Sequence, residues 1–167
     1  MSITLHPDGR IDGFNRLSMP SGSVIQTVYS HTTATAVLDY NETWSQLQTN
    51  ITPSSTSSSI LVMVTLGLTS TDSSADVAFD ILRDSTALQQ GSGGSVNATT
   101  GCFMNHSSGH AFNANLIMLD DEISTTSQVT YKIRANANNP RRLVINKRGQ
   151  DAAVQTQSRM TLMEIAG

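Results

Sequence analysis

The sequence predicts an all-β protein: an antiparallel β-sandwich preceded by an extended N-terminal arm. Short segments that alternate between apolar and polar residues recur along the chain, and clusters of Gly, Ser, Asn and Asp separate them. Ser and Thr make up about a quarter of the residues, and Thr favours strands whereas Ser favours turns. No window of the sequence has the 3.6-residue apolar period of an amphipathic helix.

The first 22 residues are predicted to form the arm. Neither a period of 2 nor one of 3.6 residues persists there, and turn-forming residues interrupt the segment at Pro7, Gly9, Gly13, Pro20 and Gly22. A segment of this kind is flexible in isolation. We therefore expect a partner surface, either sister subunits or another protein, to hold residues 1–22, and we expect residues 23–167 to form the sandwich.

Seven later segments have the pattern of strands. Residues 127–137 alternate most regularly and place Val129, Tyr131 and Ile133 on one face. Residues 58–70 begin apolar on both faces, as a central strand of a sandwich does. The predicted strands are 23–30, 58–70, 76–84, 111–119, 127–137, 143–146 and 158–166.

Strands of this number and spacing are typical of a sandwich. The preferred topology is a jelly-roll, in which eight strands form two Greek keys, because surface domains of viruses use it repeatedly. An immunoglobulin-like sandwich is the alternative.

The charge of the chain restricts the classes of partner. Charged residues make up 14% of the sequence and the net charge is −3, so phosphate neutralisation does not favour nucleic acid as a partner. The basic residues around 141–148 are interpreted as a solvated hairpin surface. No segment approaches the ~20 apolar residues of a membrane span, and the N-terminus lacks the apolar core of a signal peptide. We expect neither membrane insertion nor secretion.

Several predicted strands carry apolar residues on their outward faces. In a weakly charged monomer such residues would form exposed patches, which usually mark interfaces. Closed symmetric oligomers bury such patches. The residues concerned are Ile25 or Val28, Leu61, Met63, Leu82 and Met163, of which Met63 and Met163 are the principal interface candidates.

Metal and phosphate sites are weakly indicated. Cys102, His106 and His110 have the spacing C-x3-H-x3-H, but Ser, Gly and Asn between them indicate a polar loop, and a zinc site needs a fourth ligand. As the only cysteine, Cys102 also excludes an intrachain disulfide. A histidine ring around a threefold axis is the one version of a metal site that merits a check. Residues 120–122 are interpreted as a solvated acidic turn, and residues 91–95 as a mobile loop.

The sequence has no G-x-S-x-G motif and few aromatic residues that could stack on a sugar. We therefore expect no catalytic residues, no cofactor and no enzymatic activity. Trp44 lies in a segment between predicted strands, and Trp44 and Tyr40 are the first candidates for stacking on a glycan. Packing in the core or in an interface is the favoured alternative for both.

Four segments carry a family resemblance. The Ser/Thr-rich turn and apolar strand ITPSSTSSSILVMV (51–64) and the closing strand RMTLMEIAG (159–167) occur together. Between them lie FDILRDSTALQQG (79–91) and MLDDEISTTSQVTYKIRA (118–135). These motifs resemble a family of small β-sandwich domains in tail fibres and surface proteins of marine bacteriophages, over residues 20–167.

The resemblance implies a virion protein that is assembled in the cytoplasm of a bacterial host, and it implies a trimer. The arm would dock on another virion component by strand addition. One hypothesis is a capsid decoration or head-fibre protein, favoured because 167 residues leave no room for a fibre shaft. The other is a host-recognition module of a tail fibre, which would bind cell-surface glycan or protein weakly and multivalently.

Overall fold

The computed structural model describes residues 4–5, 7, 11–12, 19–39, 42–70, 76–92, 98, 100–104, 112–135, 143–148 and 153–167. Within these ranges the chain forms thirteen β-strands and no helix. It therefore has, over the part described, no helix that could cross a bilayer.

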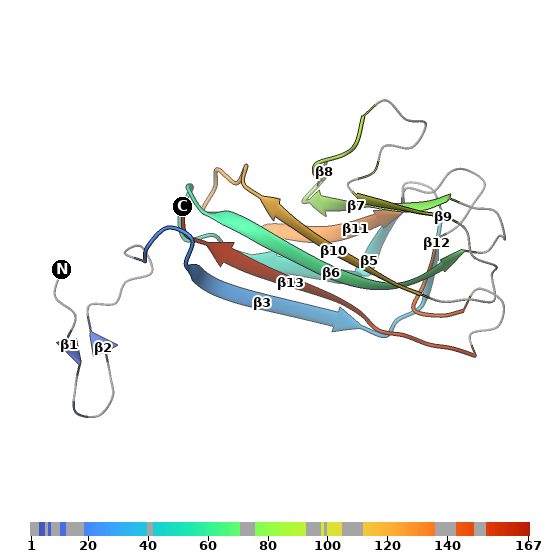
Figure 1. Cartoon of the computed structure of the whole chain (residues 1–167), viewed down its shortest axis with the longest axis horizontal. Coiled ribbons are helices and arrows are strands. Elements are labelled where there is room, and N and C mark those ends of the chain that lie inside the picture. The colour runs from blue at the N-terminus through green and yellow to red at the C-terminus, as the bar shows by residue number, and fades with distance from the viewer. Residues whose placement is uncertain are drawn as a thin grey trace.

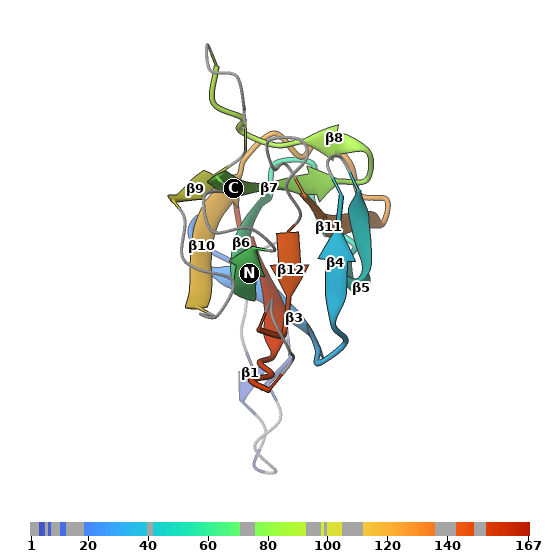
Figure 2. The same cartoon turned by 90° about the vertical axis from the view of Figure 1, so that its right-hand side faces the viewer.

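Two antiparallel sheets face each other and form a sandwich (Figures 1 and 2). The first sheet has the order β3-β13-β6-β10, and two short strands continue it beside the far end of β6. Its strands are β3 (Val24–Thr32), β13 (Ser158–Ile165), β6 (Ser59–Ser70), β10 (Phe112–Asp120), β12 (Leu143–Ile145) and β4 (Ala36–Leu38). The second has the order β5-β11-β7, and β8 and β9 share the outer edge of β7. Its strands are β5 (Thr43–Ile51), β11 (Val129–Ala135), β7 (Asp76–Arg83), β8 (Thr86–Ala87) and β9 (Thr100–Met104).

The strand order is that of a jelly-roll. Numbered along the chain, the eight principal strands β3, β5, β6, β7, β9, β10, β11 and β13 occupy the two sheets as 1-8-3-6 and 2-7-4-5. This is the double Greek key that the strand pattern of the sequence favours. The immunoglobulin-like alternative is wrong, because its sheets would group the first, second, fifth and fourth strands together.

All seven predicted strands are present, but the prediction that the segment around Trp44 lies between strands is wrong. That segment is β5, and its inward side chains are Trp44, Leu47, Thr49 and Ile51. The spacing of three residues between the first two reflects a bulge, where Ile133 pairs with Trp44 but Lys132 pairs with Gln48. The bulge breaks the two-residue period, so the pattern does not indicate a strand.

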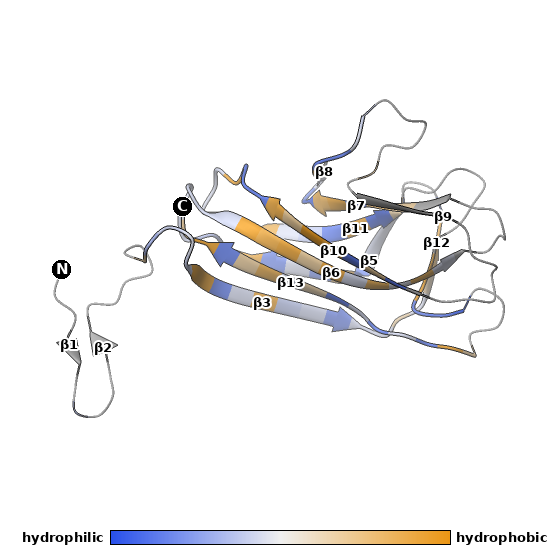
Figure 3. Cartoon of the chain, viewed as in Figure 1, coloured by the Kyte–Doolittle hydropathy of each residue, from blue (hydrophilic) through white to orange (hydrophobic). Residues whose placement is uncertain are grey.

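The core lies between the sheets and follows from the alternation of each strand. In β6 the even-numbered residues from Ile60 to Leu68 are buried, and Figure 3 shows how apolar residues concentrate along this central strand. From the facing sheet, Phe79, Ile81, Tyr131 and Ile133 are fully or almost fully buried.

Part of the arm forms a small hairpin. Strands β1 (Thr4–Leu5) and β2 (Ile11–Asp12) pair with each other, Thr4 opposite Asp12 and Leu5 opposite Ile11. The hairpin stands beyond the end of the sandwich where the C-terminus lies (Figure 1). The chain then joins the sandwich through Gly22, whose N–H donates to Ala166 O at 2.8 Å. The division into arm and sandwich at residue 22 stays a prediction.

Candidate interaction surface

On the outer face of the first sheet, the register of the four long strands aligns side chains in rows that run across the sheet. Successive rows across β3, β13, β6 and β10 are Thr27, Met163, Leu61 and Leu119, and then Tyr29, Thr161, Met63 and Ile117. At the end nearest the arm, Val24 pairs with Ile165. We call the apolar residues of these rows the apolar outer face: Val24, Tyr29, Leu61, Met63, Ile117, Leu119, Met163 and Ile165.

Half of these side chains are well exposed. Ile117 is 70% exposed, Tyr29 54%, Val24 48% and Leu119 44%, and the other four are half-buried. Single exposed apolar residues are ordinary, but a contiguous group on one sheet face marks an interaction site. The face is therefore a candidate protein-protein interface.

The face becomes polar away from the arm. The next row is His31, Arg159, Thr65 and Asn115. In this row Thr65 Oγ1 donates to Asn115 Oδ1 at 2.8 Å, and the ring of His31 stacks on Tyr29 at 5.4 Å between centroids. Arg159 is the one charged residue on this face among those that the structure describes. A partner on the apolar rows would therefore bury no formal charge.

The structure brings the two predicted methionines together on this face. Thr161 of β13 lies opposite Met63, and Met163 two residues further lies opposite Leu61. Leu82 is different: it is buried, so its prediction as an outward interface residue is wrong. The segment after β8 returns across β7, as the 3.0 Å bond from Gln90 Nε2 to Asp80 Oδ1 shows, and removes this strand from the surface.

The predicted glycan and metal residues do not form a site in the part of the chain described. Trp44 is 2% exposed in the core, so its indole cannot stack on a sugar, and the favoured alternative of core packing holds. Tyr40, His106 and His110 lie outside the described residues, and of Cys102 only the strand position in β9 is described. No three described His, Cys, Asp or Glu side chains converge as metal ligands would.

A buried carboxylate that the sequence analysis missed lies at the arm end of the sandwich. Glu164 is fully buried, and its Oε1 accepts hydrogen bonds of 2.7 Å from Ser54 N, Ser54 Oγ and Ser58 Oγ. Its Oε2 accepts one of 2.6 Å from Gln26 Nε2. Burial raises the pKa of the Glu164 carboxyl, but the bonds from Ser54, Ser58 and Gln26 outweigh it, so the net pKa lies below the usual value. The carboxylate connects β3, β13 and the turn before β6.

The signal for Glu164 was present in the sequence. In β13 the alternation of Met160, Leu162 and Glu164 places the carboxyl on the inward face. The serines that bind it belong to the Ser-rich turn SSTSSS (54–59). These hydrogen bonds hold the Ser-rich turn against the last strand.

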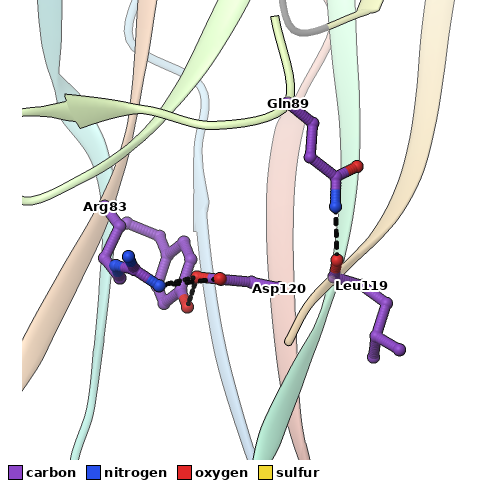
Figure 4. Close-up of polar contacts among 5 residues, drawn as sticks. Arg83, Gln89, Leu119 and Asp120 are labelled. Atoms are coloured by element: carbon purple, nitrogen blue, oxygen red, sulfur yellow. Dashed lines mark hydrogen bonds and ion pairs between the residues drawn. The ribbon is translucent and has the colours of Figure 1, made fainter. Parts of the chain in front are cut away.

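A second buried cluster joins the two sheets (Figure 4). Arg83 Nη1 of β7 donates to both oxygens of Asp120 on β10, at 2.7 and 2.9 Å, and Tyr131 Oη of β11 donates to Oδ2 at 2.6 Å. Burial raises the pKa of Tyr131, and the hydrogen bond to Asp120 raises it further. Asp120 was predicted in a solvated turn; this is wrong, because β10 extends to Asp120 and directs it inward.

A third cluster lies at the opposite end. Asn146, at φ 58°, donates from Nδ2 to Thr32 O and Ala34 O at 3.0 Å and accepts from Ser158 Oγ at 2.7 Å. A positive φ is a backbone state that Asn adopts more readily than most residues. Like the other two clusters, this one connects strands of the sandwich, and we assign all three to its stability.

Comparisons with known proteins identify no family. No protein-family model matches the chain, and no curated protein matches it. Similar solved structures come from infectious bursal disease virus: the VP2 subviral particle (10% identity, TM-score 0.46), the Gt strain (11%, 0.43) and virus-derived T=1 particles (12%, 0.42). The alignments cover 99 to 100% of this chain but only 40 to 42% of those chains. These values are too low for inferring a common function.

Proposed function

We propose that this chain is a non-enzymatic structural protein of a bacteriophage virion that forms a trimer through its apolar outer face. The observation that carries the proposal is the contiguous apolar half of one sheet face, which presents four well-exposed apolar side chains and no formal charge. The proposed assembly site is the host cytoplasm. The jelly-roll topology and the motif resemblance to phage surface proteins support the virion setting.

We place the protein on the capsid, as a decoration or head-fibre protein. Such a protein adds interface area to a shell. This chain suits that role, because its sandwich would bury one sheet face against sister copies while its arm is anchored elsewhere. The arm would attach by main-chain pairing, as an added strand does.

The second candidate is a host-recognition module of a tail fibre. The polar end of the outer face favours it, because Tyr29 is exposed beside His31, and a shallow hollow lies between Met63, Ile117 and Arg159. An exposed aromatic ring beside hydrogen-bonding side chains is a surface on which a glycan can stack and bond. This candidate requires that the copies assemble through another surface, because a trimer that leaves this face free would present three such surfaces and act by avidity.

Immunogold electron microscopy of intact particles, with serum against the recombinant protein, tests the proposal. Gold over the head supports the decoration role. Gold at the tail supports the host-recognition candidate, and glycan binding then becomes the assay. Particles without gold would remove the virion proposal, provided that the serum detects the protein in infected-cell lysate.

Replacing Met163 with glutamate is expected to convert the oligomer to monomers. The carboxylate would lie in the apolar rows, where an interface would bury it unpaired, at a cost of several kcal/mol. Size-exclusion chromatography with light scattering measures the mass, and circular dichroism confirms the fold. Gln48→Glu, an exposed position of β5 in the other sheet, is the matched control. An unchanged mass for Met163→Glu would exclude this position from the interface.

Deleting residues 1–19 is expected to leave a folded, soluble sandwich that no longer joins particles. The residues that connect the arm root to the sandwich, Gly22 and Ser23, are retained, as are their bonds to Ala166. Co-sedimentation of the tagged truncated protein with particles, beside the tagged full chain, measures the effect. Equal recovery of the two proteins would show that the arm is not the anchor.

A further inference from the structure

Strand β10 is an edge strand whose free edge is long and regular and, among the described residues, is paired with no other strand. It pairs with β6 over nine consecutive residues without a register shift, and no other described strand pairs with it. Natural proteins protect such edges with charges, prolines or bulges, because unpaired main-chain groups recruit other strands. The outward residues of β10 are Asn113, Asn115, Ile117 and Leu119, which include neither a charge nor a proline.

The hydrogen bonds of β6 indicate which residues of β10 turn their N–H and C=O groups to the free edge. Gly67 N–H donates to Ser158 Oγ at 3.2 Å, and Gly67 O accepts from Asn146 N at 2.9 Å; both partners lie on the side of β6 away from β10. Along an antiparallel strand, the N–H and C=O groups of successive residues point alternately to the two sides of the strand. The odd-numbered residues of β6 therefore face away from β10, and so the odd-numbered residues opposite them on β10, such as Asn115 and Ile117, turn their N–H and C=O groups to the free edge.

A side-chain bond confirms this direction independently. Leu119 O accepts from Gln89 Nε2 at 2.6 Å, and Gln89 lies in the segment after β8 and not in β6 (Figure 4). Gln89 thus covers one end of the edge. The groups of Asn115 and Ile117 have no strand partner among the described residues.

The other long edge strands are less suitable acceptors. The pairing of β5 with β11 shifts register between Lys132 and Ile133, and that of β3 with β13 shifts between Glu164 and Ile165. Such bulges twist an edge and interrupt the regular spacing that an incoming strand needs. The most regular free edge therefore belongs to β10.

The β1–β2 hairpin, for its part, needs a further strand to pair with. Its two strands pair with each other and with no described strand of the sandwich. An isolated two-stranded hairpin is at best marginally stable in water and needs a third strand. The hairpin stands at the same end of the molecule as the Ile117–Asp120 end of β10 (Figure 1). Its paired residues include a single charge, on Asp12, so pairing to the uncharged edge meets no like charge.

We propose that the β1–β2 hairpin of one copy adds to the free edge of β10 in a second copy. The inference rests on the proposed function, in which the chain forms a trimer and the arm attaches by strand addition, and it names a sister subunit, in place of another virion component, as the arm's partner. Each copy donates one hairpin and accepts another, a head-to-tail contact that closes when three copies form a ring. Main-chain bonds supply the affinity, as in other cases of strand addition.

The test is cross-linking between two differently marked full-length copies, both carrying Cys102→Ser. One copy carries Leu5→Cys in the hairpin, and the other carries Ile117→Cys on β10. After mixing and treatment with a short bismaleimide, we expect a cross-linked species that contains both copies, as judged by size tags, and little product from either copy alone. Homodimers of the Ile117→Cys copy without any product between the two different copies would show that β10 meets a second β10 or the outer face of another copy, and would overturn the proposal.

A proline variant tests the main-chain contact itself. Asn115→Pro removes the N–H that faces the free edge and leaves the bonds to β6, so an edge position tolerates it. Asn115→Ala is the matched control, because both variants lose the side-chain bond with Thr65 but only the proline variant loses the edge donor. Introduced into the Ile117→Cys copy, the proline is expected to lower the cross-linking yield about tenfold, the equivalent of one main-chain hydrogen bond.

The outcomes separate this inference from the proposed function. A trimer by light scattering without any cross-link between hairpin and β10 would overturn the strand-addition inference and leave the trimer standing. Monomers throughout would contradict both. Cross-linking within a single chain that carries both cysteines, at high dilution, would show that the hairpin folds back on its own β10, which would also overturn the exchange between copies.

Discussion

Replacing Asp120 with alanine is expected to lower the free energy of unfolding by about 3–5 kcal/mol, the usual cost of removing one partner of a buried ion pair. Arg83, whose side chain is 19% exposed, would lose its bidentate partner between the sheets. Tyr131 Oη would lose its acceptor at a fully buried position. Because Asp120 lies on one sheet and its donors lie on the other, the loss acts on the contact that holds the sandwich together.

Urea denaturation followed by tryptophan fluorescence measures this effect well. Trp44 is the only tryptophan and lies in the core, so its emission reports the loss of packing between the sheets. Asp121→Ala, at the neighbouring exposed position, is the control and should change stability by less than about 0.5 kcal/mol. Tyr131→Phe should cost about 1 kcal/mol, since it removes only one of the hydrogen bonds. A stability for Asp120→Ala within about 1 kcal/mol of the wild type would contradict the role assigned to the cluster.

The fold was predictable because most strands keep a strict alternation. The residues of β11 from Val129 to Ala135 alternate between buried and half-buried without interruption, and the prediction from the pattern is confirmed. The failure at β5 has a local cause, since the bulge opposite Lys132 and Ile133 shifts the inward position by one residue. A two-residue period cannot describe a strand that contains such an insertion.

For the buried polar clusters, the sequence predicts which carboxylates point inward but not which residues bind them. Alternation alone places Glu164 after Met160 and Leu162, and Asp120 after Leu116 and Met118, on inward faces. Their partners are a different matter, because Ser54 is 110 residues from Glu164, and Arg83 is 37 residues from Asp120. Strand order decides which distant segments meet, and no local pattern encodes it.

The same limit applies to the candidate interaction surface. Met63 and Met163 were expected to face outward, and both lie on the apolar outer face. Ile117 and Leu119 complete that face, but only the pairing of β10 with β6 brings them beside the methionines. Whether the face is an interface stays a prediction.

The distribution of charge links the core to the surface. Only 14% of the residues are charged, and several of these are consumed inside the sandwich or against it: Glu164 and Asp120 are buried, and Asp80 is buried under a 2.5 Å ion pair with Arg134. In a chain with so few charges, this use of carboxylates in structural bonds leaves fewer for the exterior. The apolar rows of the outer face, which carry no charged side chain, agree with this small number of exterior charges.

Replacing Glu164 with glutamine is expected to lower the free energy of unfolding by about 2–3 kcal/mol near neutral pH. The amide keeps one acceptor oxygen, but its NH2 group would meet either Gln26 Nε2 or the three donors from Ser54 and Ser58, so at least one buried donor loses its acceptor. The exposed Glu122→Gln in the turn after β10 is the matched control for loss of one carboxylate.

The pH dependence distinguishes the carboxylate from a merely space-filling residue. Because the pKa of Glu164 is lowered in the folded protein, the unfolded chain takes up this proton at a higher pH than the folded one does. The stability that Glu164 supplies is therefore fully present above the ordinary carboxyl pKa of 4.5 and is lost as the pH falls through the lower folded value. Urea denaturation of wild type and Glu164→Gln between about pH 7 and pH 3 should show the two stabilities converging in acid. A difference that stays constant over that range would mean that the ionised carboxylate is not what binds the Ser-rich turn to the last strand.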